Sequence, residues 1–402
     1  MPAPLTPTEL RALFPATSRS AYLNAAAASP ISLPVEEAVR AHYAEGVETG
    51  DLHFDGWLKR REDARRRFAA FIGATAQEVA FVPSTSFGFN VVADVLQQRG
   101  VEEIVTLDAE FPSTTIPFLS HGMRLRVVRA RPDGTYWPED VEAAIGPRTG
   151  AVALSAIQFA SGFRMDLEAV ARVCRSKGVL FAVNGAQALG QMAFDVAATG
   201  IDFLCGTSHK WMYAGYGVGL FFARRELLET SSLPMCGWLS VEAPWEMNNL
   251  AGAKVTGRDG DSVWFGAEGT RFRKEASALE AGCVAFGPLF GFSAALGLHE
   301  AVGMETTERH IARLQAQLRA GLRSRGFVPN RPDDAERGSG ICVIPVEGAP
   351  NEVVRAMVKE GVMLTPRGVG VRISTHVFND EADVERLFWA MEKVGVKPAP
   401  RT

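Results

Sequence analysis

The 402-residue sequence contains no apolar run of the roughly 18 residues that a membrane-spanning helix requires, and no long block of like charge. Lysine and arginine (42 residues) nearly balance aspartate and glutamate (46), which gives a formal net charge of −4 at pH 7. Proteins that bind nucleic acids usually carry a clustered basic excess. We therefore expect neither a membrane protein nor a nucleic-acid-binding protein, and the length predicts two or three domains.

Cysteine is scarce, and no Cys-x-x-Cys pair occurs among Cys174, Cys205, Cys236, Cys283 and Cys342. An odd number of cysteines at such wide spacing argues against a disulfide framework and against a zinc knuckle. The N-terminus also lacks the basic start and apolar core of a secretory signal. The seven histidines form no ligand-like cluster, so no metal site is predicted, and the expected compartment is a reducing cytoplasm.

Short apolar stretches alternate with helical patterns over most of the chain. Each stretch is a predicted strand that ends in a polar loop: EVAFV (78–82), EIVTL (103–107), AVALSAI (151–157), GVLFAV (178–183) and IDFLCG (201–206). Strands that alternate with helices predict an α/β fold with a mainly parallel sheet sandwiched by helices. In such sheets ligands bind at the carboxyl ends of the strands. A helix is expected over residues 36–72, before the first of these strands.

The pattern changes near residue 285, where a long amphipathic helix precedes the predicted strands GICVIPV and GVGVRIS and a closing helix. We therefore expect a smaller C-terminal α+β domain over residues 285–402 and a large domain over residues 21–284. Residues 1–20 are expected to form a segment that packs on the small domain. Residues 231–275 fit neither periodicity and are expected to form an ordered excursion with a flexible centre.

A lysine at the end of a predicted strand is the strongest candidate for chemistry. Lys210 lies among aromatic and small residues, and Thr207 and His209 add donors suited to a phosphate. Burial lowers the pKa of a lysine, and its neutral amine can then form a Schiff base. A lone lysine is nevertheless more often an exposed surface residue, so its neighbours in the fold must decide.

Two other loops bring polar residues to the same edge of the predicted sheet. Asn184 follows the strand FAV, and Gln187 comes three residues later. The Ser-Thr-Ser run at residues 84–86 stands between a strand and a helix, where hydroxyl and backbone N–H groups bind anions. Taken alone, such a run is more often only a helix N-cap.

The order and spacing of these motifs resemble the class V aminotransferase family of fold-type I pyridoxal 5'-phosphate (PLP) enzymes, which includes cysteine desulfurases and C–S lyases. The resemblance extends from AYLNAAAASP (21–30) through EFPSTTIPF (110–118), VNGAQALG (183–190) and SHKW (208–211) to VRISTHVFND (371–380). It implies a homodimer whose site lies near the subunit interface, and an aldimine between PLP and Lys210. It also implies these cofactor-binding residues: Ser84, Thr85, Ser86, Phe111, Asn184, Gln187, Thr207, His209 and Cys283.

The resemblance gives three of these positions a specific role. Phe111 matches the residue whose ring stacks on the pyridine, and Gln187 lies beside the phenolic oxygen of the cofactor. Arg372 matches the arginine that binds the substrate carboxylate, which suits the planar fork of a guanidinium. The alternative for Arg372 is a structural salt bridge.

The sequence departs from the family pattern at three places. Asn184 stands where the family has the aspartate that keeps the pyridine nitrogen protonated, and a neutral amide cannot supply that charge. Cys283 replaces a threonine that reaches the phosphate from a neighbouring subunit in relatives. The segment before Arg372 has no cysteine, and Cys342 lies in an apolar strand, so a desulfurase with a nucleophilic cysteine is not expected.

These observations favour a PLP-dependent enzyme that acts on a small amino acid or amine. Aminotransfer ranks first because it is the broad family activity, followed by C–S or β-elimination and by epimerisation. A protein that kept the fold and lost full catalysis is the contrasting hypothesis, which Asn184 and Cys283 favour.

Overall fold

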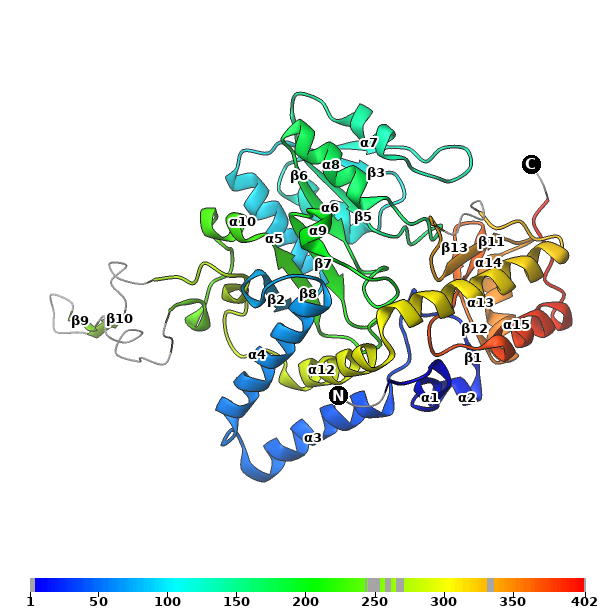
Figure 1. The fold of residues 1–402 in the computed structure, drawn as a ribbon, viewed down its shortest axis with the longest axis horizontal. Coiled ribbons are helices and arrows are strands. Elements are labelled where there is room, and N and C mark those ends of the chain that lie inside the picture. The colour runs from blue at the N-terminus through cyan, green and yellow to red at the C-terminus, as the bar shows by residue number, and fades with distance from the viewer. Residues whose placement is uncertain are drawn as a thin grey trace.

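The computed structural model describes residues 4–242, 244, 254–256, 262–264, 271–330 and 336–400. A seven-stranded sheet of order β2-β8-β7-β6-β5-β3-β4 forms its centre (Figure 1). Only β8 runs antiparallel to its neighbours; the other adjacent pairs are parallel. The strands are β2 (Val79–Val82), β3 (Glu103–Leu107), β4 (Arg124–Val128), β5 (Thr149–Ser155), β6 (Leu180–Asn184), β7 (Phe203–Thr207) and β8 (Gly219–Ala223).

Helices cover both faces of this sheet, because alternate residues of each strand point to opposite sides and both sides are apolar. In β3, Val105 and Leu107 join one buried cluster, whereas Ile104 joins the other. The helices are α3 (Leu33–Thr49), α4 (Phe54–Phe71), α5 (Thr85–Gln98), α6 (Pro112–Ser120), α7 (Pro138–Ala144), α8 (Leu167–Lys177), α9 (Val196–Thr199), α10 (Arg225–Thr230) and α12 (Phe286–Val302). The predicted parallel sheet between helices is confirmed.

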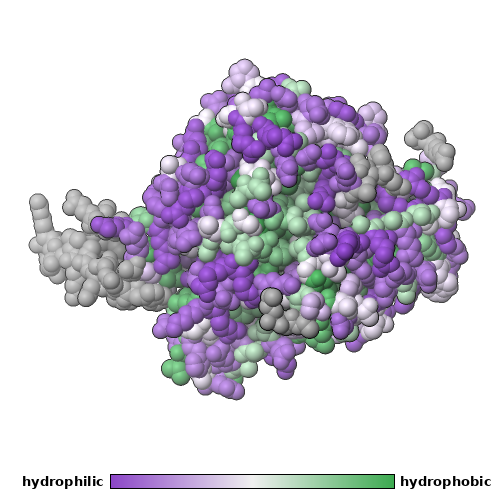
Figure 2. Space-filling view, in the orientation of Figure 1, coloured by the Kyte–Doolittle hydropathy of each residue, from purple (hydrophilic) through white to green (hydrophobic). Residues whose placement is uncertain are grey.

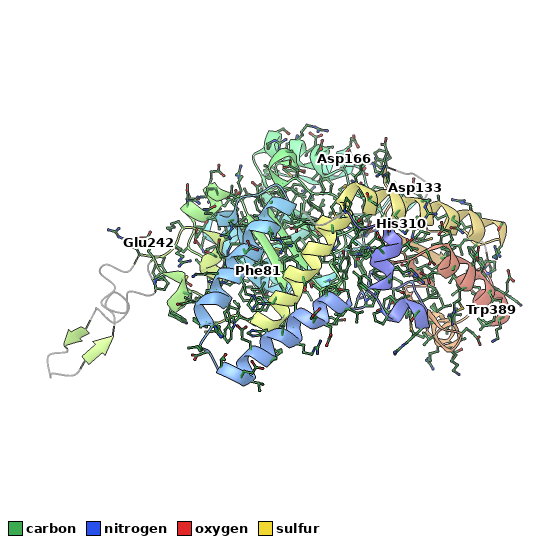
Figure 3. All side chains as sticks on the ribbon, turned by 60° about the horizontal axis from the view of Figure 1, so that its bottom comes forward. Phe81, Asp133, Asp166, Glu242, His310 and Trp389 are labelled. Carbon is green, nitrogen blue, oxygen red and sulfur yellow. The ribbon has the colours of Figure 1, made fainter. Side chains whose placement is uncertain are left out.

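A smaller antiparallel sheet of order β11-β14-β13 lies beside the large one and has its own apolar core (Figure 1). Phe81 of β2 and Trp389 of α15 mark the two parts of the molecule in Figure 3. The elements of the smaller part are α13 (Met304–Ser324), β11 (Ile341–Pro345), α14 (Pro350–Lys359), β12 (Val362–Met363), β13 (Thr365–Arg367), β14 (Gly370–Ser374) and α15 (Glu381–Lys393). The predicted smaller α+β part is therefore also present.

The N-terminal segment contains α1 (Pro7–Ala12) and α2 (Ala16–Arg19), and its Arg11 pairs with Asp383 of α15 at 2.8 Å. The next strand, β1 (Ala21–Tyr22), pairs with β12 of the smaller part. In contrast, α12 packs against α3 and α4 of the larger part. The expected domain boundaries at residues 21 and 285 stay a prediction.

The single helix expected over residues 36–72 is wrong, because the structure has two helices, α3 and α4, in this stretch. Helix α3 ends at Thr49, and the following residue, Gly50, has a positive φ of 64°, which glycine adopts without steric cost. Of the stretch expected to form an excursion, the described parts include η2 (Trp238–Ser240), β9 (Lys254–Thr256) and β10 (Ser262–Trp264). The other residues of its centre, which was expected to be flexible, lie outside the described residues. Two further short helices are η1 (Ala76–Glu78) and η3 (Ala276–Leu279).

The surface seen in Figure 2 is mostly hydrophilic, with apolar residues gathered near the middle of the view. Within the described residues, no helix combines the length and apolarity that crossing a membrane demands.

Candidate active site

A cavity of about 340 Å³ lies at the carboxyl ends of the strands of the large sheet, with β13 and β14 of the small sheet also contributing to its lining. Every predicted site residue except Cys283 lines it: Ser84, Thr85, Ser86, Phe111, Asn184, Gln187, Thr207, His209, Lys210 and Arg372. The sequence had not singled out the remaining lining residues, Ala26, Ala27, Ser113, Ser155, Phe159, Ala186 and Arg367.

Lys210 follows β7 and is the only amine among the described residues that line the cavity. Desolvation, followed by the positive charges of Arg372 and Arg367, lowers the pKa of its amine to about 8. Its Nζ lies 5.3 Å from the ring centroid of Phe111, and that ring meets Phe159 edge to face. A substantial fraction of this lysine is therefore neutral near pH 8, beside an aromatic wall.

The start of α5 forms one end of the cavity. Ser84 is the N-cap, its Oγ accepting from the N–H of Phe87 at 3.2 Å, and Thr85 Oγ1 donates to the carbonyl of Gly206. The first N–H groups of a helix have no acceptor within it and attract anions. A Cβ on Gly219 would lie 2.7 Å from three backbone atoms of Ser84, so only glycine lets β8 approach this helix start.

Further donors gather at the same end. Thr207 Oγ1 and His209 Nδ1 are hydrogen-bonded at 2.7 Å, and the hydroxyls of Ser86 and Ser113 lie 2.8 Å apart. Desolvation, helped by the charge of Lys210, lowers the pKa of His209 to about 4. His209 is therefore a neutral hydrogen-bonding group near pH 7, and it does not add a positive charge.

Asn184, at the end of β6, is held in one orientation by hydrogen bonds on both sides of its amide. Its Nδ2 donates to Thr114 Oγ1 at 2.8 Å, and its Oδ1 accepts from the N–H of Ala186 at 2.9 Å. The hydroxyl of Thr114 also lies near the buried carboxylate of Glu110 and helps to lower the pKa of that carboxyl. Because the backbone N–H of Ala186 can only donate, the amide oxygen of Asn184 must face it, and the second N–H of Nδ2 remains as a donor to the cavity.

Glu110 is an ionisable group that the sequence did not single out, although it opens the motif EFPSTTIPF. It accepts from the N–H of Ser155 and from Gln158 Nε2, both at 2.7 Å, and from the hydroxyl of Ser155. Desolvation raises the pKa of this carboxyl, and these hydrogen bonds oppose the shift. A glutamate preceding the expected stacking residue was the available signal.

Gln187 is fixed in the same way as Asn184. Its Oε1 accepts from the indole N–H of Trp211 at 2.7 Å, and its Nε2 donates to the carbonyl of Ala26 at 2.9 Å. One N–H of the amide remains for a ligand. Gln187 can therefore donate to an oxygen inside the cavity.

Arg372 is 1% exposed, and only its Nη1 has a protein partner within the described residues, the carbonyl of Phe159 at 3.2 Å. Its Nε and Nη2 are buried without a hydrogen bond. Desolvation, followed by the charge of Arg367, lowers the pKa of Arg372 to about 9. No acidic side chain of the described chain pairs with it, so the structure does not show the alternative salt bridge.

These residues fit PLP. A helix start with hydroxyls suits a phosphate, an aromatic ring suits a flat pyridine, and two fixed amides suit its polar edge. Two arginines and a lysine without an acidic partner suit a ligand with several negative charges.

Cys283 is exposed and lies outside the cavity of its own chain. Cys342 is buried in β11, and the segment from β12 to β14 contains no cysteine. The structure therefore shows no cysteine nucleophile at the cavity. Among the described residues, no group of three His, Cys, Asp or Glu side chains is placed to hold a metal ion.

Comparisons with known proteins agree with this geometry. A sequence profile described as Aminotransferase class-V matches residues 21–387. The uncharacterized aminotransferase YcbU of Bacillus subtilis is 25% identical over 97% of this chain and 98% of its own length. The cysteine desulfurase of Thermococcus onnurineus has a similar structure, with a TM-score of 0.84 at 24% identity over 98% of this chain and 99% of that one. The cystine C–S lyase C-DES also has a similar fold, with a TM-score of 0.78 at 19% identity over 94% of this chain and 98% of that one.

The fold and the site together define a PLP-dependent enzyme of fold type I. Since the profile match spans most of the sequence, the chain belongs to the class V aminotransferase family. The resemblance drawn from the sequence motifs is confirmed.

Proposed function

We propose that this enzyme is aminotransferase-like and acts on a small amino acid, with Lys210 as the residue that attaches PLP and moves the substrate proton. The observation that carries this proposal is the pKa of about 8 of a lysine at a strand end, beside an unpaired buried arginine. When bound, PLP supplies an aldehyde for an amine and an electron-withdrawing ring. The chain's own residues bind, orient and exchange protons around it.

Each residue has a distinct task in this proposal. The start of α5, with Thr207 and His209, holds the phosphate, and Phe111 covers one face of the ring. Asn184 and Gln187 donate hydrogen bonds to the ring nitrogen and to the phenolic oxygen. Lys210 would hold the cofactor through its Nζ, and the same amine would take and return the proton of the substrate α-carbon. Arg372 holds the carboxylate.

The absorption spectrum of purified protein tests this proposal. We expect a visible or near-ultraviolet band that borohydride bleaches, and a reduced PLP adduct on the peptide that contains Lys210. Lys210→Ala should lose the adduct and keep the wild-type circular dichroism. A colourless protein that cannot be reconstituted with PLP would instead support a fold that has lost catalysis.

A C–S or β-lyase is the second candidate, with an epimerase beside it. Asn184 favours it, because a neutral donor leaves the ring a weaker electron sink than an aspartate does, and some eliminations need less carbanion stabilisation. Assays for keto-acid-dependent amino transfer, for pyruvate release and for racemisation separate these reactions. Persulfide formation by a cysteine nucleophile is not expected, because none lies at the cavity.

A homodimer in the cytoplasm completes the proposal. The exposed position of Cys283 suits a residue that approaches a neighbouring subunit's site, and its thiol would be a weak phosphate donor there. No disulfide joins the five cysteines, all of which lie within the described residues, and this suits a reducing compartment. Light scattering after size-exclusion chromatography measures the oligomeric state directly.

A further inference from the structure

Arg367 places a second guanidinium in the same cavity as Arg372. In the pairing of β13 with β14, Thr365 lies opposite Arg372, and Arg367 lies opposite Gly370. Directly paired residues and residues two apart share a face of the sheet, so Arg367 and Arg372 are diagonal neighbours, close enough for long side chains to reach the same ligand. Both side chains line the cavity.

Neither arginine is neutralised by the protein. Within the described residues, Arg367 Nε is buried without a hydrogen-bond partner, as are two nitrogens of Arg372. The lining residues include no aspartate or glutamate. Arg367 lies over the ring of Phe159, 5.2 Å from its centroid, which keeps the guanidinium beside the cavity without cancelling its charge. Holding two like charges together in this way is costly unless a ligand supplies two anions.

The phosphate of PLP does not account for the second arginine. The phosphate donors lie at the start of α5 and after β7, whereas both arginines lie on the small sheet. If Arg372 takes the α-carboxylate of the substrate, Arg367 remains for a group on the substrate side chain. A neutral amino acid would leave it unpaired.

We propose that Arg367 is a second carboxylate-binding residue and that the substrate is an amino acid with an acidic side chain. The proposal rests on the proposed function and assigns the substrate class of the same site. The ring of Phe159, which lies beside both arginines, then faces the methylene groups between the two carboxylates. The enzyme would discriminate against neutral amino acids, because these would leave the charge of Arg367 without a partner.

Binding of unreactive acids to the PLP-loaded enzyme tests the proposal without turnover. Glutarate, with two carboxylates, and butyrate, with one, are compared by calorimetry. We expect glutarate to bind roughly 10- to 150-fold more tightly, the range of one charge-assisted hydrogen-bonded contact. Arg367→Gln should remove this preference and leave butyrate affinity within about twofold. The exposed Arg225→Gln is the matched control and should preserve the preference.

Turnover supplies a second measure. Arg367→Gln should lower kcat/KM for glutamate by roughly 10- to 150-fold relative to norvaline, which lacks the second carboxylate, and Arg367→Lys should restore part of the loss. Equal binding of glutarate and butyrate by the wild type would overturn the proposal. So would an Arg367→Gln variant that loses PLP affinity but keeps the glutarate preference. Failure of the proposed function would appear separately, as a protein that forms no Lys210 adduct.

Discussion

Lys210 shows how the surroundings of one side chain set its chemistry. Its amine has a pKa of about 8 because it is desolvated and because Arg372 and Arg367 repel its charged form. An acylating reagent reacts only with the neutral amine. The extent of Lys210 acylation in the PLP-free protein should therefore rise with pH, with a midpoint near 8. Arg372→Gln removes one repulsive charge and should move the midpoint to higher pH. Peptide mass analysis of Lys210 against pH measures both midpoints, and identical midpoints would contradict the electrostatic explanation.

Asn184→Asp restores the charge that the family places beside the pyridine nitrogen. An opposite charge raises the pKa of that nitrogen in bound PLP, so exchange of the substrate α-proton should accelerate and PLP should bind more tightly. The structure adds a complication, because Thr114 has one hydroxyl proton and would face two carboxylates, Asp at 184 and Glu110. Proton exchange followed by NMR, with PLP affinity beside it, measures the effect.

Glu110→Gln supplies the comparison for this prediction. In the double variant, Thr114 is free to donate to the new aspartate, so the acceleration should be larger than in Asn184→Asp alone. Since Asn184-Gly185 is prone to deamidation, peptide mass analysis of fresh protein must first establish which residue is present. Unchanged proton exchange in both variants would show that Asn184 does not face the pyridine nitrogen.

At the scale of the elements, one buried carboxylate joins α4, β2 and the segment after η3. Glu280 accepts hydrogen bonds from the N–H of Phe81 at 2.9 Å and from Arg65. It forms ion pairs with Arg61 and Arg65, and the side chains of both arginines are largely buried. Glu280→Ala would remove the carboxylate that Arg61 and Arg65 share, and Arg65 would keep only the exposed carboxylate of Glu62. The variant should therefore lower the free energy of unfolding by about 3–5 kcal/mol. Urea unfolding measures this loss. Glu229→Ala, which breaks an exposed pair with Arg225, should cost less than about 1 kcal/mol.

The elements also show where sequence patterns succeed. The strands were predictable because each is a short apolar run between polar loops, and EIVTL coincides with β3. The break between α3 and α4 was missed because both sides carry helical patterns, and the break depends on the conformation of Gly50. A helical hydrophobic pattern continues through a turn when the helices on both sides have similar composition, so the pattern does not reveal the break.

At the scale of the whole molecule, His376 joins the small sheet to the loop that carries Lys210. Its Nε2 donates to the carbonyl of Trp211, and its Nδ1 accepts from the N–H of Val377, both at 2.7 Å. Both nitrogens are used by the neutral ring, and desolvation lowers the pKa of His376 to about 3. The contact between the two parts therefore requires an uncharged histidine.

This histidine makes stability depend on pH. Below about pH 6.5 the unfolded chain protonates this residue while the folded chain does not, so stability falls as the pH drops from 6.5 toward 3. When the pH is lowered from 7 to 5, the free energy of unfolding of His376→Gln should fall by about 2 kcal/mol less than that of the wild type. Urea unfolding at both pH values measures the difference, and the exposed His53→Gln should behave as the wild type. If the free energy of unfolding fell by the same amount in the wild type and in His376→Gln, His376 would not be the source of the pH dependence.

The sequence by itself determined the fold class, the family, and ten of the seventeen residues that line the cavity, Lys210 among them, because strand ends and loop motifs are local features that converge at one sheet edge. It did not determine the hydrogen bonds with Thr114 and Ala186 that orient the amide of Asn184. Nor did it identify Arg367, whose role depends on the pairing of β13 with β14 and on the absence of a lining carboxylate. Such features depend on which groups are buried together, and burial decides the charge of each group and whether it finds a partner.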